Sequence, residues 1–132
     1  MIDLEMELFS KIKEILPEGT NLSNLYEATP AVLPTISFLM SDNRVYEEAE
    51  SSSGEEEAAL LTFSVIGYCE RTQEKKEICK GLIALCNTVM HSAGFRRTMM
   101  QPEEPKEESA SIYKIMAKYE AVVDKNHIIY RR

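Results

Sequence analysis

The change of hydrophobic period between Ala59 and Phe95 constrains the fold more than any other feature of the sequence. From Leu60 to Ile66, bulky side chains occur on both faces of a two-residue repeat, which is typical of a strand buried on both sides. Beyond Thr72 the period becomes helical, and one apolar stripe is formed by Ile78, Leu82, Leu85, Cys86 and Val89. Because neither element can remain alone in water, the sequence predicts a sheet covered by a long helix.

The remaining segments are predicted to extend this sheet and to add a second helix. Apolar spacing predicts an N-terminal helix at residues 2–16, capped by Asp3 and ended by Pro17. Then follow, in order, a connector at 17–33, strands at 34–40, 44–48 and 57–69, the long helix at 72–92, and strands at 95–101, 111–123 and 127–131. The first two strands are predicted to form a hairpin around Ser41-Asp42-Asn43, which is turn chemistry.

This order, α-β-β-β-α-β-β-β, predicts one α+β domain over residues 1–132. We expect a mixed but mainly antiparallel sheet of about five or six strands, with both helices packed on one face. The segment 111–123 gives the clearest alternation, because its apolar positions alternate with Lys114, Lys118 and Glu120. Its predicted core face consists of Tyr113, Ile115, Ala117, Tyr119, Ala121 and Val123.

The net charge of −7 is concentrated in two segments. Residues 47–57 contain six glutamates: Glu47, Glu48, Glu50, Glu55, Glu56 and Glu57. Residues 102–109 contain four more: Glu103, Glu104, Glu107 and Glu108. Both segments are predicted to be solvated loops. The rest of the chain is nearly neutral and has no run of Lys and Arg, which argues against sequence-specific nucleic-acid binding.

The sequence does not contain the residue patterns of common catalytic or metal sites. Its two histidines, His91 and His127, lack the spacing of a zinc site, and its glycines are scattered rather than gathered in a phosphate loop. Its three cysteines contain no CxxC and are predicted to pack in the core. We therefore expect no enzyme activity, no catalytic or metal-binding residues and no cofactor.

The N-terminus is acidic, and no apolar run approaches the roughly 20 residues that span a bilayer. We therefore expect a protein made in the cytoplasm, with no membrane partner. Arg96 and Arg97 follow the long helix, and neighbours on a strand face opposite ways. They are either a solvated edge or salt-bridge partners for the acidic loop of another subunit.

An ordered series of segments resembles one protein family. The series consists of Leu33-Pro34-Thr35-Ile36, Gly67-Tyr68, Ala93-Gly94-Phe95-Arg96, Ile112-Tyr113-Lys114, Tyr119 to Asp124, and Ile129-Tyr130-Arg131. From about Leu33 to its end, the chain resembles the tail terminator or tail-completion (head-to-tail joining) proteins of long-tailed bacteriophages and prophages. The order and spacing of the segments carry this resemblance, rather than any single motif.

The resemblance implies a small α+β protomer that assembles into a hexameric ring in the virion. Such a ring caps the tail tube, contacts the tail tube protein and the head-connector or neck protein, and lets DNA pass without reading its sequence. The glutamates of 47–57 and 102–109 are then candidates for contacting these partners or for lining the lumen, where they would repel phosphate. Arg96 and Arg97 are candidates for contacts between subunits.

Three alternatives remain open at this point. The chain could be another neck or minor capsid protein of similar fold, or an adaptor that binds proteins by strand addition at a sheet edge. A small enzyme or ligand-binding domain would instead require a concave polar pocket. The candidate residues for such a pocket are Tyr68, Glu70, His91 and Arg96.

Overall fold

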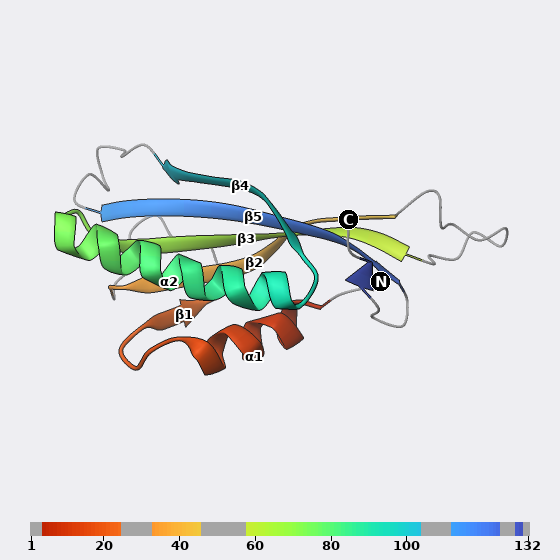
Figure 1. Ribbon diagram of the computed structural model, residues 1–132, viewed down its shortest axis with the longest axis horizontal. Coiled ribbons are helices and arrows are strands. Elements are labelled where there is room, and N and C mark those ends of the chain that lie inside the picture. The colour runs from red at the N-terminus through yellow and green to blue at the C-terminus, as the bar shows by residue number, and fades with distance from the viewer. Residues whose placement is uncertain (1–3, 25–32, 46–57, 104–111, 125–128, 131–132) are drawn as a thin grey trace, which may run out of the picture.

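The computed structural model describes residues 4–24, 33–45, 58–103, 112–124 and 129–130, which form two helices and a six-stranded mixed sheet (Figure 1). The elements are α1 (Glu5–Ile15), β1 (Asn21–Ser23), β2 (Thr35–Val45), β3 (Ala58–Glu70), α2 (Gln73–Ser92), β4 (Arg96–Glu103), β5 (Ile112–Asp124) and β6 (Ile129–Tyr130). Both helices lie on the same face of the sheet. The predicted α+β fold is confirmed.

The long strands β3 and β5 form the centre of the sheet. They pair antiparallel along their whole length, from Ala58 opposite Asp124 to Glu70 opposite Ile112. The strand order is β1-β2-β3-β5-β4, and β6 pairs with the end of β5 that β4 does not reach. Among the described strands, β1 and β4 are therefore the two outer edges of the sheet.

Aromatic side chains fill the centre of the core between the sheet and the helices. The ring of Phe63 on β3 stacks on Phe38 of β2, with centroids 5.0 Å apart, and meets Phe95 edge to face at 5.5 Å. Leu8 and Ile12 of α1 join the same cluster. All six positions predicted for the core face of the late strand are buried: Tyr113, Ile115, Ala117, Tyr119, Ala121 and Val123.

The hairpin predicted around Ser41-Asp42-Asn43 is wrong, because β2 runs through these residues. It pairs with β3 from Thr35 to Val45, with a shift of register between Met40 and Asp42. Ser41 is the extra residue, and its hydroxyl donates to the Thr62 carbonyl at 3.2 Å. The short polar side chains that favour a turn also satisfy backbone groups at a β-bulge, so local chemistry alone did not distinguish the two. Residues 46–48, the end of the second predicted strand, lie outside the described residues.

The predicted connector at 17–33 contains a strand, β1, that no local pattern in the sequence indicates. β1 runs parallel to β2, with Asn21 opposite Thr35 and Ser23 opposite Ser37. Three residues are too few to show a two-residue alternation, and a parallel partner close in sequence gives no hairpin signal.

The ends of the helices follow local sequence signals. The hydroxyl of Thr72 accepts a hydrogen bond from the amide of Lys75 at 3.2 Å, which confirms the predicted N-cap of α2. After α2, Gly94 has a φ of 97°, a left-handed conformation that suits glycine at a helix end. Helix α1 ends before Pro17 as predicted, whereas Asp3 lies outside the described residues and Leu4 stands at the N-cap position.

The buried face of α2 is turned relative to the predicted stripe. The buried residues are Cys79, Leu82, Ile83, Cys86 and Met90. By contrast, the Ile78 side chain is 42% exposed, and Leu85 and Val89 are only partly buried. Leu82 and Cys86 of the predicted stripe are therefore buried as expected, whereas its other three residues lie at the side of the sheet-facing surface, where α2 borders α1 and a cleft.

Gly67 lets α2 approach β3 closely. A Cβ atom at this position would lie 2.7 Å from Cys79 Sγ and 3.3 Å from Ile83 Cδ1. We therefore expect Gly67→Ala to lower the free energy of unfolding by about 1–3 kcal/mol in chemical denaturation, the usual cost of overpacking. Cys79→Ala in the same chain should recover part of this loss, because it removes the clashing sulfur.

The matched control for this substitution is Gly81→Ala on the exposed side of α2, where nothing lies within 4 Å of the added Cβ. It should raise stability by up to about 1 kcal/mol, because alanine is the better helix former. Wild-type stability for Gly67→Ala would contradict the close approach of α2 to β3.

Candidate functional site

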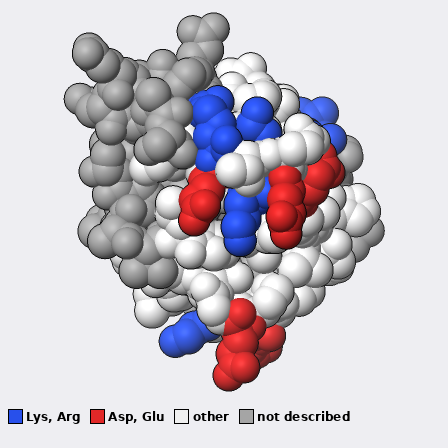
Figure 2. All heavy atoms as spheres, turned by 90° about the vertical axis from the view of Figure 1, so that its left-hand side faces the viewer, with Lys and Arg blue, Asp and Glu red and all other residues white. Residues whose placement is uncertain are grey.

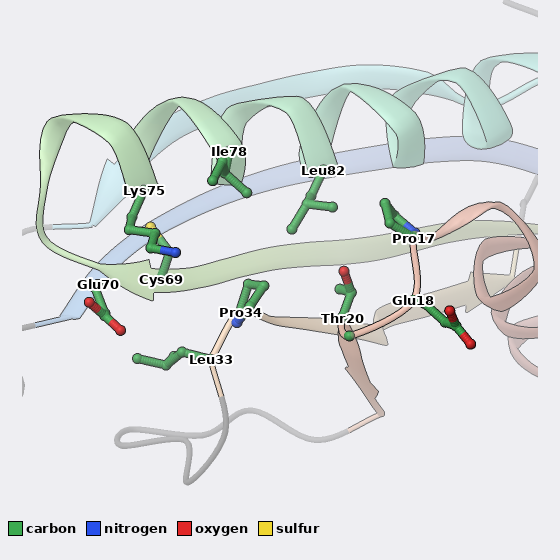
Figure 3. Close-up of a pocket in the computed structure, with 11 residues that line it drawn as sticks. Pro17, Glu18, Thr20, Leu33, Pro34, Cys69, Glu70, Lys75, Ile78 and Leu82 are labelled. Atoms are coloured by element: carbon green, nitrogen blue, oxygen red, sulfur yellow. The ribbon is translucent and has the colours of Figure 1, made fainter.

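A cleft of about 260 Å³ opens between the first half of α2, the end of β3 and the chain before β2 (Figure 3). It is lined by Pro17, Glu18, Gly19, Thr20, Leu33, Pro34, Cys69, Glu70, Lys75, Ile78 and Leu82. Its volume lies below the range of about 300–1,000 Å³ that is usual for small-molecule pockets. The cleft is therefore better matched to one or two protein side chains than to a cofactor.

The turn after α1 builds one wall of this cleft. The Thr20 amide donates to the Pro17 carbonyl at 3.2 Å, and Gly19 between them has a φ of 90°. The Asn21 amide then donates to the Pro34 carbonyl at 3.1 Å, which ties the turn to the start of β2. These bonds hold the turn opposite α2, and the cleft between them is lined by the partly buried Leu33 and by Ile78, whose side chain is exposed.

Three charged side chains border the cleft. In Figure 3, Lys75 extends from α2 toward Cys69, whereas the carboxylates of Glu18 and Glu70 point outward on either side. Within the described part of the chain, no ion pair joins any of these three groups to another residue. The cleft thus combines an apolar interior with a border of two negative charges and one positive charge.

The cysteines are not suited to nucleophilic chemistry. All three are buried, as predicted for core residues. Burial raises the pKa of the Cys69 thiol, which shares a hydrogen bond with Cys79, and it raises the pKa of Cys86 to about 12. The thiolate, which is the reactive form, is therefore disfavoured near neutral pH.

The residues considered for an enzyme-like pocket are not gathered in one place. Glu70 borders the cleft, but Tyr68 is fully buried with Ile66 and Ile112 in a cluster separate from the main core. His91 is exposed in the last turn of α2, where a positive charge suits the helix dipole. Arg96 lies on β4 and does not line the cleft.

Arg96 and Arg97 are both exposed but lie on opposite faces of β4. Arg96 is opposite Glu120 of β5, and these two side chains form an ion pair of 2.9 Å on the face away from the helices. Arg97 is opposite Tyr119 on the helix side. Its guanidinium Nη1 lies 3.2 Å from Met100 Sδ, and no carboxylate of the described residues pairs with it.

Met100 lies at the surface of the protein. Its side chain is 38% exposed on the outer strand β4. It lies opposite Ala117, a residue of the main core, and therefore on the helix side. Met100 and Arg97 thus form a small apolar and basic patch on β4, an outer strand among those described.

The predicted acidic loops lie almost entirely outside the described residues. Glu103 is the exception and ends β4 opposite Lys114, so the strand extends beyond the predicted boundary and through Pro102. An edge strand tolerates proline, which explains this difference. The others lie outside the described residues: Glu47, Glu48, Glu50, Glu55, Glu56, Glu57, Glu104, Glu107 and Glu108.

The described residues that flank the two acidic segments lie at opposite ends of the sheet. Val45 and Ala58 flank the first segment at the end where Ala58 pairs with Asp124. Glu103 and Ile112 flank the second at the other end, where Ile112 pairs with Glu70.

Charges of both signs are mixed where α2 begins, as Figure 2 shows. Arg71 and Lys76 lie over the ring of Tyr113 at 5.9 and 5.2 Å, and Lys80 pairs with Glu77 at 3.6 Å. This end therefore has no extended region of a single charge among its described residues.

Among the residues placed by the structure, no three His, Cys, Asp or Glu side chains gather in a way that could hold a metal ion. Neither described helix has the length and hydropathy needed to cross a membrane. Neither the models of known protein families nor the curated proteins give a match to this chain.

Proposed function

We propose that this chain is a structural protein of a long-tailed bacteriophage or prophage, which ends the tail tube and joins it to the head connector as one protomer of a hexameric ring. The observation that carries the proposal is that the family-like segments coincide with successive parts of one folding unit. They begin β2, end β3, join α2 to β4 and make up most of β5. The resemblance therefore follows successive elements of the framework of the domain.

The shape of the sheet supports a protomer that joins head to tail. Its two outer edges differ, because β1 has three residues and runs parallel to its neighbour, whereas β4 has eight and runs antiparallel. Contacts between two different surfaces generate rings when the rotation closes. The flanks of the acidic segments at opposite ends of the sheet suit contacts with the tail tube at one end and the neck at the other.

Strand addition at β4 is the second candidate function, and three features of that edge disfavour it. Arg96 and Arg97 are charged, the register shifts at Thr98, and Pro102 has no amide hydrogen. Natural sheets use edge charges, bulges and prolines to prevent pairing with other strands. The β4 edge is therefore better suited to side-chain docking than to extension of the sheet.

Deleting the gene from the phage or prophage that encodes it tests the proposed function. We expect filled heads and separate tails of uncontrolled length in electron micrographs, and we expect joined particles again when the wild-type chain is supplied. Mass spectrometry of purified wild-type particles should detect the chain as a virion component. Separate tails of normal length would indicate a neck protein of similar fold, and unchanged particles without the chain would refute a tail role.

A further inference from the structure

We propose that the cleft beside α2 receives the Met100 and Arg97 side chains of the next copy of this chain. Met100 would pack against Leu33, Ile78 and Leu82, and Arg97 would pair with Glu18. This contact rests on the proposed function, because it identifies the surfaces that join protomers in the ring.

The cleft has the chemistry to receive an apolar side chain accompanied by a positive charge. Ile78 is 42% exposed and is the uncovered end of the apolar stripe of α2. The border of the cleft has two negative charges, Glu18 and Glu70, and one positive charge, Lys75. An incoming cation therefore meets a net negative charge. Glu18 lies away from Lys75, across the cleft from the first turn of α2 (Figure 3).

The patch on β4 has the complementary chemistry. Met100 is 38% exposed, and Arg97 lies against its sulfur with no carboxylate partner among the described residues. Methionine adapts its shape to irregular apolar surfaces, and arginine is among the residues enriched in protein interfaces. The neighbouring Arg96 is already paired with Glu120, so Arg97 is the arginine available to another subunit.

The two surfaces cannot meet within one chain. The cleft is lined by the chain before β2 and by Cys69 and Glu70 at the end of β3, whereas the patch lies on β4, and β5 separates β3 from β4. Two strand spacings of about 4.8 Å place β3 and β4 roughly 10 Å apart. Cys69 pairs with Tyr113 and Met100 with Ala117, so the two surfaces are also separated by roughly 13 Å along β5. A contact between cleft and patch therefore joins two copies, and because the surfaces differ, the pairing continues from copy to copy.

Charge reversal provides the test, with sedimentation velocity at low salt over a range of concentrations as the readout. Wild-type chains should associate beyond a dimer. Arg97→Glu and Glu18→Arg should each raise the dissociation constant about tenfold or more, because each places like charges in the contact. An equal mixture of the two variants should assemble, because every contact between unlike chains then joins opposite charges.

Matched variants test the apolar half of the contact. Met100→Ser should raise the dissociation constant about 30-fold, as expected for a residue at the centre of an interface. Met6→Ser on α1, where the side chain is 72% exposed, should leave it within about twofold. Arg96→Gln should also leave association unchanged, since Arg96 faces the other side of β4. Circular dichroism should show that all variants remain folded.

Two results would overturn this contact. The first is a wild-type chain that stays monomeric at every concentration, and the second is a mixture of Arg97→Glu and Glu18→Arg chains that associates no better than either alone. Neither result would change the phenotype expected when the gene is deleted. The two experiments therefore distinguish an error in the proposed contact from an error in the proposed tail function.

Discussion

Phe63→Ala is expected to lower the free energy of unfolding by about 3–5 kcal/mol, the range for removing a large aromatic side chain from a core. Phe63 is completely buried and contacts two other rings, stacked on Phe38 and edge to face with Phe95. Each aromatic pair adds about 0.5–1.5 kcal/mol beyond the area that it buries. Because domains of this size are stable by only about 5–15 kcal/mol, urea denaturation followed by circular dichroism should show a large shift.

The control for this substitution is Thr62→Ala, one residue earlier on β3. Thr62 faces away from the helices and is only partly buried. Replacing Thr62 with alanine should lower the free energy of unfolding by less than about 1 kcal/mol, as for most changes outside a core. Equal losses at Phe63 and Thr62 would contradict the assignment of the helix-covered face as the main core.

Two isoleucines of α2 should differ sharply when each is replaced by alanine. Ile83 is completely buried, although it lies outside the stripe predicted from the sequence, whereas Ile78 belongs to that stripe and is 42% exposed. Ile83→Ala should lower the free energy of unfolding by about 2–5 kcal/mol in the same urea measurement. Ile78→Ala should cost less than about 1 kcal/mol, because little buried area is lost.

The comparison of these two variants tests the rotation of α2 directly, since both remove the same atoms from the same helix. A larger loss at Ile78 than at Ile83 would mean that the predicted stripe faces the sheet after all. Ile78→Ala should also weaken self-association while leaving the fold intact, because Ile78 belongs to the cleft proposed to receive Met100.

Several elements were predictable because their signals lie within a few residues of chain. The Thr72 hydroxyl caps the amide three residues later, and Gly94 adopts the left-handed conformation immediately after the helix. The alternation of β5 needs only the strand itself to show which face is apolar. The α+β class follows from the order of such elements, because each apolar face requires a partner to cover it.

The candidate site was much less predictable, because its parts come from distant segments. The cleft joins the turn at Pro17, the start of β2, the end of β3 and the first half of α2, and no local pattern indicates that these meet. The sequence placed Arg96 and Arg97 together on a strand. Only the register with β5 shows that Arg96 forms an ion pair with Glu120, whereas the guanidinium of Arg97 contacts the sulfur of Met100.

The sequence by itself therefore determined the type of most elements, both ends of α2, the end of α1 before Pro17 and the class of the fold, since these depend on periodic burial and on hydrogen bonds between near neighbours. The tertiary structure alone decided that Ser41 forms a bulge rather than a turn, that three residues at Asn21 form a strand, and which side of α2 is buried. Each of these outcomes depends on a partner element. A backbone group forms its hydrogen bond with the strand that the fold places beside it, and an apolar side chain is buried only where another element covers it.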